Sequence, residues 1–374
     1  MERMTELSRM MLNSAKEPMS ISEAVDILEV NAQFRTLQDK LNAFSNGTNL
    51  KSVLVEGLLA NHPEQKRDAI DKKVRNWLSG RTQSISKEDA IELCFILKLD
   101  AEQADTFIAQ IAEEGIHWRN PSEIAYGYAL TAGMDYLQAK SLVLRVQEAL
   151  DGKAQPAKED SDVFTTLVKN EIMSISDQEA LINYIIESSQ KLGSMHNTAY
   201  HLFMDFMNTL EGGAIEDGLD EESAMSTKEV LENYLYRKMV PVSERKKGVD
   251  KTKAAFTDAQ KSVRANWPDE AALSKMKSRQ TDVTRKVLML LFLVTNGGES
   301  EYEDDEDLDW EPTRDEIFVS TFTRLNQMLI ECGFQRLDPR NRFDWMVLYC
   351  MCVDDIFDVD QKISDFLAEL FPEE

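Results

Sequence analysis

Apolar residues recur every three or four positions over long stretches of this chain, the spacing that places them on one face of an α-helix. The clearest stretch contains Phe318, Phe322, Leu325, Leu329 and Cys332. Residues 317–323 taken alone also alternate as a β-strand would, but the apolar face continues in helical register to Cys332. The 374 residues include only 15 glycines and 9 prolines, fewer than a turn-rich β fold uses. We therefore predict an all-α fold.

Polar segments interrupt the helical pattern at about residues 151–160 and 296–313. The second segment is strongly acidic: eleven acids and one base, Arg314, occur between Glu299 and Glu316. Such a block repels itself and is typical of a loop. At roughly 150 residues per domain, the length corresponds to two or three units. We predict an N-terminal domain over 1–150, a linker over 151–160, and a larger C-terminal helical domain over 161–374 that carries the acidic loop 296–313.

The charge balance limits what the protein can bind. There are 42 Lys and Arg residues against 67 Asp and Glu residues, a formal net charge of −25. Phosphate would be repelled by most of such a surface, so coating of nucleic acid along the whole chain is excluded. Two regions are locally basic. Residues 62–87 hold seven bases and three acids, and residues 237–286 hold fourteen bases and six acids.

The first basic region overlaps a series of short motifs between Lys72 and Ile108. They are Trp77-Leu78-Ser79-Gly80, Ser86-Lys87-Glu88, Lys98-Leu99-Asp100, and Ala104 with Phe107. This series resembles the second half of a phage-repressor-type (Cro/C1-like) helix-turn-helix domain. Gly80 suits the left-handed end of a helix, and Ser86 can cap the next one. With upstream helices predicted near 33–44 and 50–60, the resemblance covers about residues 33–110.

The resemblance implies a DNA-binding surface. In this family a recognition helix enters the major groove of double-stranded DNA. Carried onto this sequence, the motif assigns groove contacts to Lys72, Lys73, Arg75 and Asn76, and a phosphate contact to Arg81. The side chains of Trp77 and Leu78 would then hold the recognition helix to the domain core.

The sequence departs from the family between its two central helices. The family joins them by a tight turn of about four residues. Here the stretch from Asn61 to Lys66, which includes Pro63, suggests a connection some four residues longer.

Candidates for catalysis and metal binding are weak. The four histidines, His62, His117, His196 and His201, form no H-E-x-x-H pattern. Asp338 and Asp344 could hold a metal ion, but Asn341 or Asp344 is better placed to cap a helix. No Walker loop, G-x-G-x-x-G or G-x-S-x-G motif occurs. We therefore expect no enzymatic activity, no metal site and no cofactor.

The cysteines and the apolar runs indicate where the protein resides. All four cysteines lie among apolar residues without zinc-site spacing, as buried thiols do in a reducing cytosol. The longest apolar run, residues 287–294, is far shorter than the ~20 residues that a membrane span requires. No secretory signal precedes the helices. We expect a cytoplasmic protein without membrane contact.

The second basic region, residues 237–286, has several interpretations. Its bases could lie on a solvated helix pair that partners the acidic loop, or they could contact nucleic acid or an acidic protein. In an intermediate hypothesis the acidic loop mimics phosphate and covers the basic face until a partner displaces it.

Together these features predict a transcriptional regulator of the bacterial or phage type. It would use the basic recognition helix on double-stranded DNA and the C-terminal region for contacts with a protein partner or for homo-oligomer formation. The alternative is a non-enzymatic adaptor, or an acidic nucleic-acid mimic, that keeps the helix-turn-helix fold as a scaffold.

Overall fold

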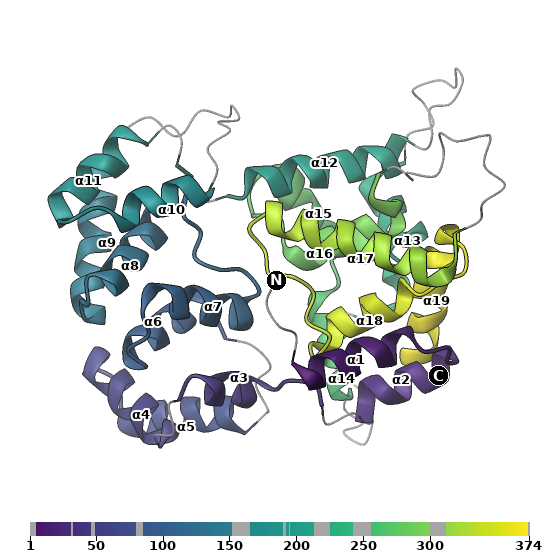
Figure 1. Ribbon diagram of the computed structural model, residues 1–374, viewed down its shortest axis with the longest axis horizontal. Helices are drawn as coiled ribbons and strands as arrows, with labels where there is room; N and C mark the ends of the chain where they lie inside the picture. The colour runs from purple at the N-terminus through teal and green to yellow at the C-terminus, as the bar shows by residue number, and fades with distance from the viewer. Residues whose placement is uncertain are drawn as a thin grey trace, which may run out of the picture. The chain divides into compact units, whose positions relative to one another are not determined.

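The computed structural model describes residues 5–30, 33–45, 49–79, 85–151, 165–189, 192–193, 195–212, 225–241, 256–298 and 312–372. These residues form α-helices joined by short connections (Figure 1). The described ranges hold no β-strand, only an isolated bridge between Glu114 and Phe334. The predicted all-α fold is confirmed. Each helix in these ranges falls short of the length or the apolarity that a membrane span requires.

The chain divides into two compact units whose bounds differ from the predicted domains. Unit 1 contains Met1–Phe34, Thr198–Cys332 and Arg336–Glu374. Unit 2 contains Arg35–Asn197 and Gly333–Gln335. The division therefore lies at neither end of the predicted linker 151–160. The first 34 residues belong with the C-terminal part of the chain, and the stretch 161–197 belongs with the middle part.

Unit 2 contains the region that resembles a repressor domain. Its helices are α3 (Leu37–Ala43), α4 (Leu50–Asn61), α5 (Arg67–Leu78), α6 (Lys87–Ile96), α7 (Ala101–Ala112), α8 (Pro121–Thr131), α9 (Tyr136–Leu150), α10 (Thr165–Met173) and α11 (Gln178–Glu187). α4 packs on α5, α6 packs on α7, and α3 contacts both α5 and α7. α8 packs on α9, and α11 packs on α9 as well, which places the residues after 165 in this unit (Figure 1).

Local sequence signals explain where the helices of this region begin. Thr36 and Asp39 form a reciprocal capping box at the start of α3, and Asp100 and Gln103 form one at the start of α7. The predicted cap Ser86 is confirmed, because its hydroxyl accepts a hydrogen bond from the Asp89 amide at 3.1 Å. Five helices, α3 to α7, thus span the stretch that carries the repressor resemblance.

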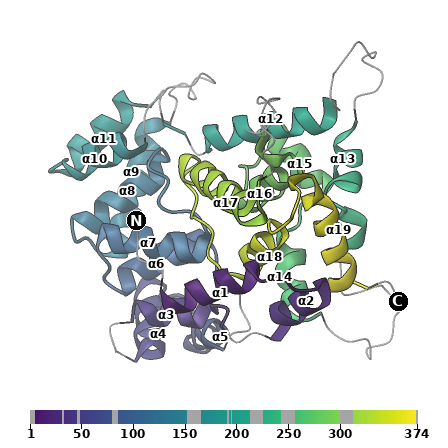
Figure 2. The same cartoon turned by 45° about the vertical axis from the view of Figure 1, so that its right-hand side comes forward.

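Unit 1 combines segments from both halves of the sequence. Its α-helices are α1 (Glu6–Lys16), α2 (Ile21–Val30), α12 (Asn197–Gly212), α13 (Thr227–Asn233), α14 (Asp258–Asn266), α15 (Glu270–Lys277), α16 (Arg285–Val294), α17 (Arg314–Glu331), α18 (Arg342–Cys350) and α19 (Val359–Leu370). α1 packs on α18, and α2 packs on α18 and α19, as the views of Figure 1 and Figure 2 agree. The indole N–H of Trp345 donates to the carbonyl of Met11 at 3.1 Å and so ties α18 to α1.

The predicted helical stripe in the C-terminal region is confirmed. Residues 317–323, which could also have formed a strand, lie within α17. Phe318, Leu325 and Leu329 of its stripe are buried, and Phe322 is half-buried. The apolar run of residues 287–294 belongs to α16, which is buried through most of its length because neighbouring helices cover it on several sides.

Candidate nucleic-acid interface

α5 is amphipathic, and its buried face fixes which residues it presents outward. Ile70, Val74 and Trp77 are each less than 5% exposed and pack into the core of unit 2. The predicted anchoring role of Trp77 is therefore consistent with its burial. On the other side, Lys72 and Arg75 are exposed, and 61% of the Arg75 side chain is accessible. Lys72 and Arg75 therefore lie on the exposed face of a helix whose other face is packed into the core of unit 2.

Several bases of α5 are paired with acids of the same unit. Lys73 Nζ lies 2.7 Å from Asp89 Oδ1 and 4.9 Å from the centre of the Trp77 ring. Arg67 at the start of α5 pairs with Glu56 of α4. Lys73, a predicted DNA contact, is therefore partly exposed, but it is also paired with an acid of the same unit.

The carboxylate of Asp71 is the centre of a second ion-pair group. Its Oδ1 lies 2.9 Å from Lys51 Nζ on α4, and its Oδ2 lies 2.9 Å from Arg75 Nε one turn further along α5. The hydrogen bond from Lys51 is the main reason that the pKa of Asp71 lies below its ordinary value, with further contributions from Arg75 and Arg67. Asp71 is therefore ionised near neutral pH and neutralises charge in the middle of the predicted DNA-binding face.

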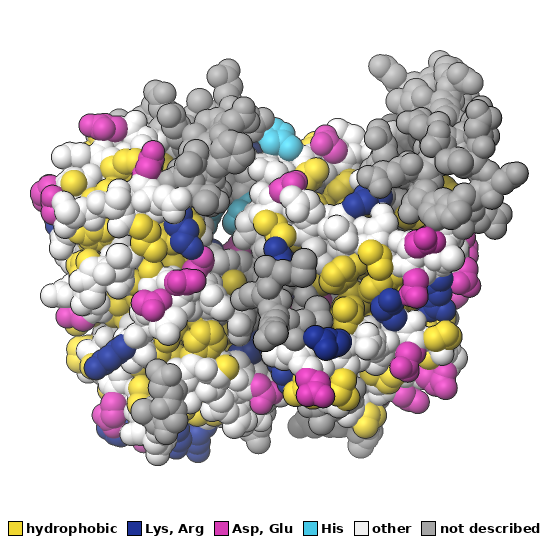
Figure 3. All heavy atoms as spheres, viewed as in Figure 1, with side chains coloured by type: hydrophobic (Ala, Val, Ile, Leu, Met, Phe, Trp, Pro, Cys, Tyr) yellow, Lys and Arg dark blue, Asp and Glu magenta, His cyan; other side chains and the backbone are white. Residues whose placement is uncertain are grey.

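The other predicted contact residues have different outcomes. Asn76 is half-buried near the end of α5, and its carbonyl accepts hydrogen bonds from the amide and the hydroxyl of Ser79. Arg81 and Gly80 lie outside the described residues. Lys72, Lys73, Arg75 and Asn76 all lie on α5, as the sequence predicted. Figure 3 shows Lys and Arg side chains, in dark blue, at the lower left of the molecule, where Figure 1 places α4 and α5.

The connection between α4 and α5 is shorter than the sequence suggested. Only residues 62–66 separate the two helices, so the connection exceeds the family's turn by about one residue rather than four. α4 continues through Asn61 and ends at His62, whose amide donates to the carbonyl of Leu58 at 2.9 Å. α4 thus includes Asn61, which the sequence pattern had assigned to the connection.

A buried carboxylate on α6, which the sequence analysis missed, fixes the end of α4. Glu92 is 4% exposed. Its oxygens accept a hydrogen bond from Asn61 Nδ2 at 2.8 Å and lie 3.0 Å from His62 Nε2. A Glu among the apolar residues Ala90, Ile91, Leu93 and Cys94 was the signal that could have revealed it. Glu92 therefore links α6 to the first residues of the α4–α5 connection.

Unit 2 also contains a buried polar cluster away from α5. Lys87 Nζ lies 3.0 Å from a Glu114 oxygen and 2.8 Å from a Glu123 oxygen. His117 is 7% exposed and stacks on His196, with ring centres 4.1 Å apart. Burial lowers the pKa of His117 to about 2, and His196 adds to this effect. These side chains contact one another and Phe334 of the same unit, so we interpret the cluster as structural.

The remaining sequence candidates in unit 1 are engaged in packing. Both oxygens of Asp344 accept hydrogen bonds from the Arg285 guanidinium, at 2.8 and 2.7 Å, and Asn341 caps α18. In the described residues, His, Cys, Asp and Glu side chains do not gather in the groups of three that a metal ion would need. The four cysteines are buried thiols.

The second basic region is only partly described. In the basic region, Lys277 pairs with Glu211 and Lys238 pairs with Glu232, at 2.7 and 2.6 Å. Lys275 is exposed. Residues 242–255 and 299–311, which hold many of the bases and most of the acidic loop, lie outside the described residues. The predicted pairing between basic region and acidic loop therefore stays a prediction.

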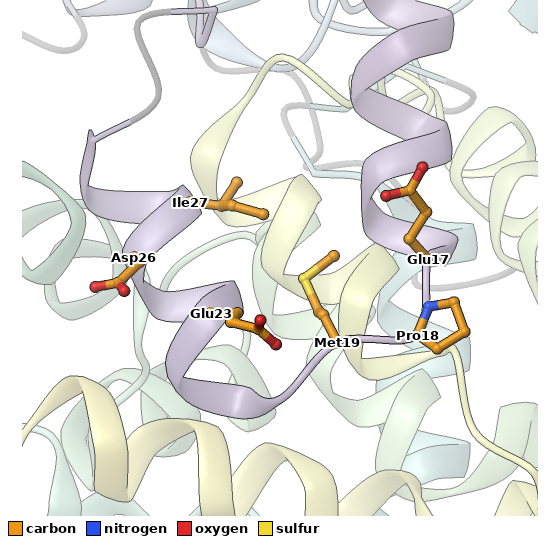
Figure 4. Close-up of a pocket in the computed structure, with 6 residues that line it drawn as sticks. All are labelled: Glu17, Pro18, Met19, Glu23, Asp26 and Ile27. Atoms are coloured by element: carbon orange, nitrogen blue, oxygen red, sulfur yellow. The ribbon is translucent and has the colours of Figure 1, made fainter.

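One surface pocket lies in unit 1 between the end of α1 and the first turns of α2 (Figure 4). Its volume is about 420 Å³, and its lining residues are Glu17, Pro18, Met19, Glu23, Asp26 and Ile27. Glu23 is committed to a local role, because its carboxylate accepts hydrogen bonds from the amide and hydroxyl of Ser20, both at 2.8 Å. The pocket is acidic and therefore unsuited to phosphate.

No known family model matches the chain, and comparison with curated proteins and with solved structures likewise finds no similar protein.

Proposed function

We propose that the protein is a DNA-binding transcriptional regulator that contacts duplex DNA through the outer face of α5. The observation that carries the proposal is the exposure of Lys72 and Arg75 on a helix whose opposite face is buried by Ile70, Val74 and Trp77. A helix with an exposed basic face and a buried apolar face is what insertion into a major groove requires. The sequence order of α3 to α7 and its repressor resemblance support the same use.

The global charge does not oppose a local contact of this kind. Phosphate attraction acts over about a Debye length, roughly 8 Å at physiological ionic strength, so nearby bases count more than distant acids. Arg75 can also form a bidentate contact with guanine, and Lys72 can contact guanine or phosphate. We therefore assign Lys72, Lys73 and Arg75 to DNA, and we keep Asn76 and Arg81 as further predicted contacts.

The test is a salt-titrated binding measurement on random-sequence duplexes. The variant Lys72→Gln/Arg75→Gln removes two exposed bases from α5. We expect wild-type affinity to fall with salt, and the variant to bind at least about tenfold more weakly with a salt slope smaller by about 2.

The matched control is Lys98→Gln/Lys140→Gln. Both lysines are exposed in unit 2 but lie off α5, and the total charge change is the same. The control should bind as the wild type does. Equal weakening in both variants, or no wild-type binding at low salt by a protein with native circular dichroism, would refute the proposal.

A second candidate is a protein adaptor that keeps this helical unit as a scaffold. The observation that favours it is the internal pairing of the α5 bases: Lys73 with Asp89, Arg75 with Asp71, and Arg67 with Glu56. An adaptor, or an acidic nucleic-acid mimic, would show no salt-dependent DNA binding and would ignore the Lys72/Arg75 substitutions. The same titration therefore separates the two candidates.

Unit 1 supplies the partner or homo-oligomer contacts in this proposal. Val319 and Ile330 on α17 are 56% and 40% exposed, which leaves apolar surface available for an interface. The proposal includes a cytoplasmic location and no catalytic role. Light scattering of the full chain across a concentration series tests the oligomer contacts.

A further inference from the structure

Asp71 lies between two bases of the proposed DNA-binding face. Its two oxygens are held by bases from two different helices, Lys51 of α4 and Arg75 of α5, each at 2.9 Å. The side chains of these bases are 47% and 61% exposed, so the group is open to solvent and to a ligand. A carboxylate gripped by a Lys and an Arg marks a position where negative charge is favoured.

We infer that Asp71 is an internal competitor for DNA phosphate, which holds Lys51 and Arg75 neutralised until a phosphate displaces it. This inference rests on the proposed function of α5. It adds Lys51 to the contact surface and makes Asp71 a residue that limits affinity rather than one that supports it.

Two physical facts determine the direction of the effect. Lys51 and Arg75 can bind a phosphate fully only after they release the Asp71 carboxylate. Breaking these two ion pairs therefore offsets part of the binding free energy that each phosphate contact contributes. The carboxylate also repels an approaching phosphate directly. Removing its charge should therefore strengthen binding and increase the number of counterions released, which steepens the salt dependence.

The test uses Asp71→Asn in the full chain with the same random-sequence duplexes. The amide keeps the size of the side chain and removes its charge. We expect affinity at low salt to rise about five- to tenfold, because two exposed ion pairs no longer compete, and the salt slope to steepen by about 1. Asp71→Glu, which restores the carboxylate, should return affinity to near the wild-type value.

Asp68 provides a matched control on the same helix. It is exposed and forms no ion pair with a described base, so Asp68→Asn makes the same charge change without releasing Lys51 or Arg75. We expect at most about a twofold gain from it, because salt screens its charge. A second control places Asp71→Asn in a Lys51→Gln/Arg75→Gln background, where the gain should disappear because the competing bases are absent.

The outcomes distinguish this inference from the proposed function. Wild-type binding that depends on Lys72, with equal effects of Asp71→Asn and Asp68→Asn, would overturn the inference and leave the DNA-binding proposal standing. A gain by Asp71→Asn that persists without Lys51 and Arg75 would also overturn it. Absence of binding by wild type and by Asp71→Asn alike, with native circular dichroism in both, would overturn the proposed function and this inference with it.

Discussion

At the scale of single residues, the decisive features of unit 2 are charged and titratable side chains that packing between helices brings together. Asp71 and Arg75 are four positions apart on one helix, so their pairing could be predicted from the sequence. Lys51 joins them only because α4 packs on α5, and no sequence period contains that information. The same holds for His117, whose burial and stacking on His196 depend on chain segments that are far apart in the sequence.

The buried imidazole of His117 predicts how stability depends on pH. Its pKa is lowered from 6.5 to about 2 in the fold, mainly by burial and further by His196, Lys87 and Arg119. In the unfolded chain the imidazole binds a proton below pH 6.5, but in the folded protein it stays neutral. The contribution of neutral His117 to the unfolding free energy is therefore fully present above pH 6.5. It falls as the pH is lowered through that value toward 2.

The comparison of wild type with His117→Phe isolates this effect. Phe keeps a ring against His196 and cannot titrate. Between pH 7 and pH 5 the unfolding free energy of the wild type should fall by about 2 kcal/mol more than that of the variant. Urea unfolding at several pH values measures it. Parallel pH profiles for the two proteins would contradict the assignment of a neutral, buried His117.

At the scale of elements, the sequence predicted helices better than their connections. α17 lies where apolar periodicity placed it, α6 begins after the predicted cap Ser86, and α5 contains the residues that the repressor resemblance assigned to a helix. The α4–α5 connection was overestimated because its length depends on where α4 ends. That end is set by Glu92, which reaches Asn61 and His62 from α6, a contact between residues about thirty positions apart.

Loss of the Glu92 carboxylate should destabilise unit 2 through this connection. Glu92→Ala leaves Asn61 and His62 without their acceptor and opens space in the core. We expect a loss of about 1–3 kcal/mol in unfolding free energy. Glu88 on the same helix is exposed, and Glu88→Ala should change stability by less than about 0.5 kcal/mol. Urea unfolding compares the two variants. Equal losses of unfolding free energy would show that the contacts of Glu92 with Asn61 and His62 do not stabilise unit 2.

At the scale of the whole molecule, composition placed the domain boundaries where polar residues cluster, but packing divides the chain elsewhere. α1 and α2 lie on α18 and α19, so unit 1 is assembled from the two ends of the described chain. Apolar stripes show that a helix has a partner without identifying that partner. Trp345 and Met11, joined by a hydrogen bond, are 334 residues apart.

Adjacent methionines on α1 test this assembly. Met11 is 1% exposed and Met10 is 49% exposed. Met11→Ala should reduce the unfolding free energy of unit 1 by about 2–5 kcal/mol, because it leaves a cavity against α18. Met10→Ala should have an effect below about 0.5 kcal/mol. Denaturant unfolding followed by tryptophan fluorescence provides the measurement. A negligible loss with Met11→Ala would mean that α1 is dispensable for the C-terminal helices.

The pairing of α1 with α18 also sets an order of events during synthesis. α1 leaves the ribosome before any of unit 2, but its partner Trp345 is translated 334 residues after Met11. Nearly all of unit 2 can fold in that interval, because its sequence is continuous except for Gly333–Gln335. During that interval the apolar face of α1 is exposed to solvent, and chaperones bind such exposed apolar segments. Of the two units, unit 1 is thus the later to close, although α1 precedes all of unit 2 in the sequence.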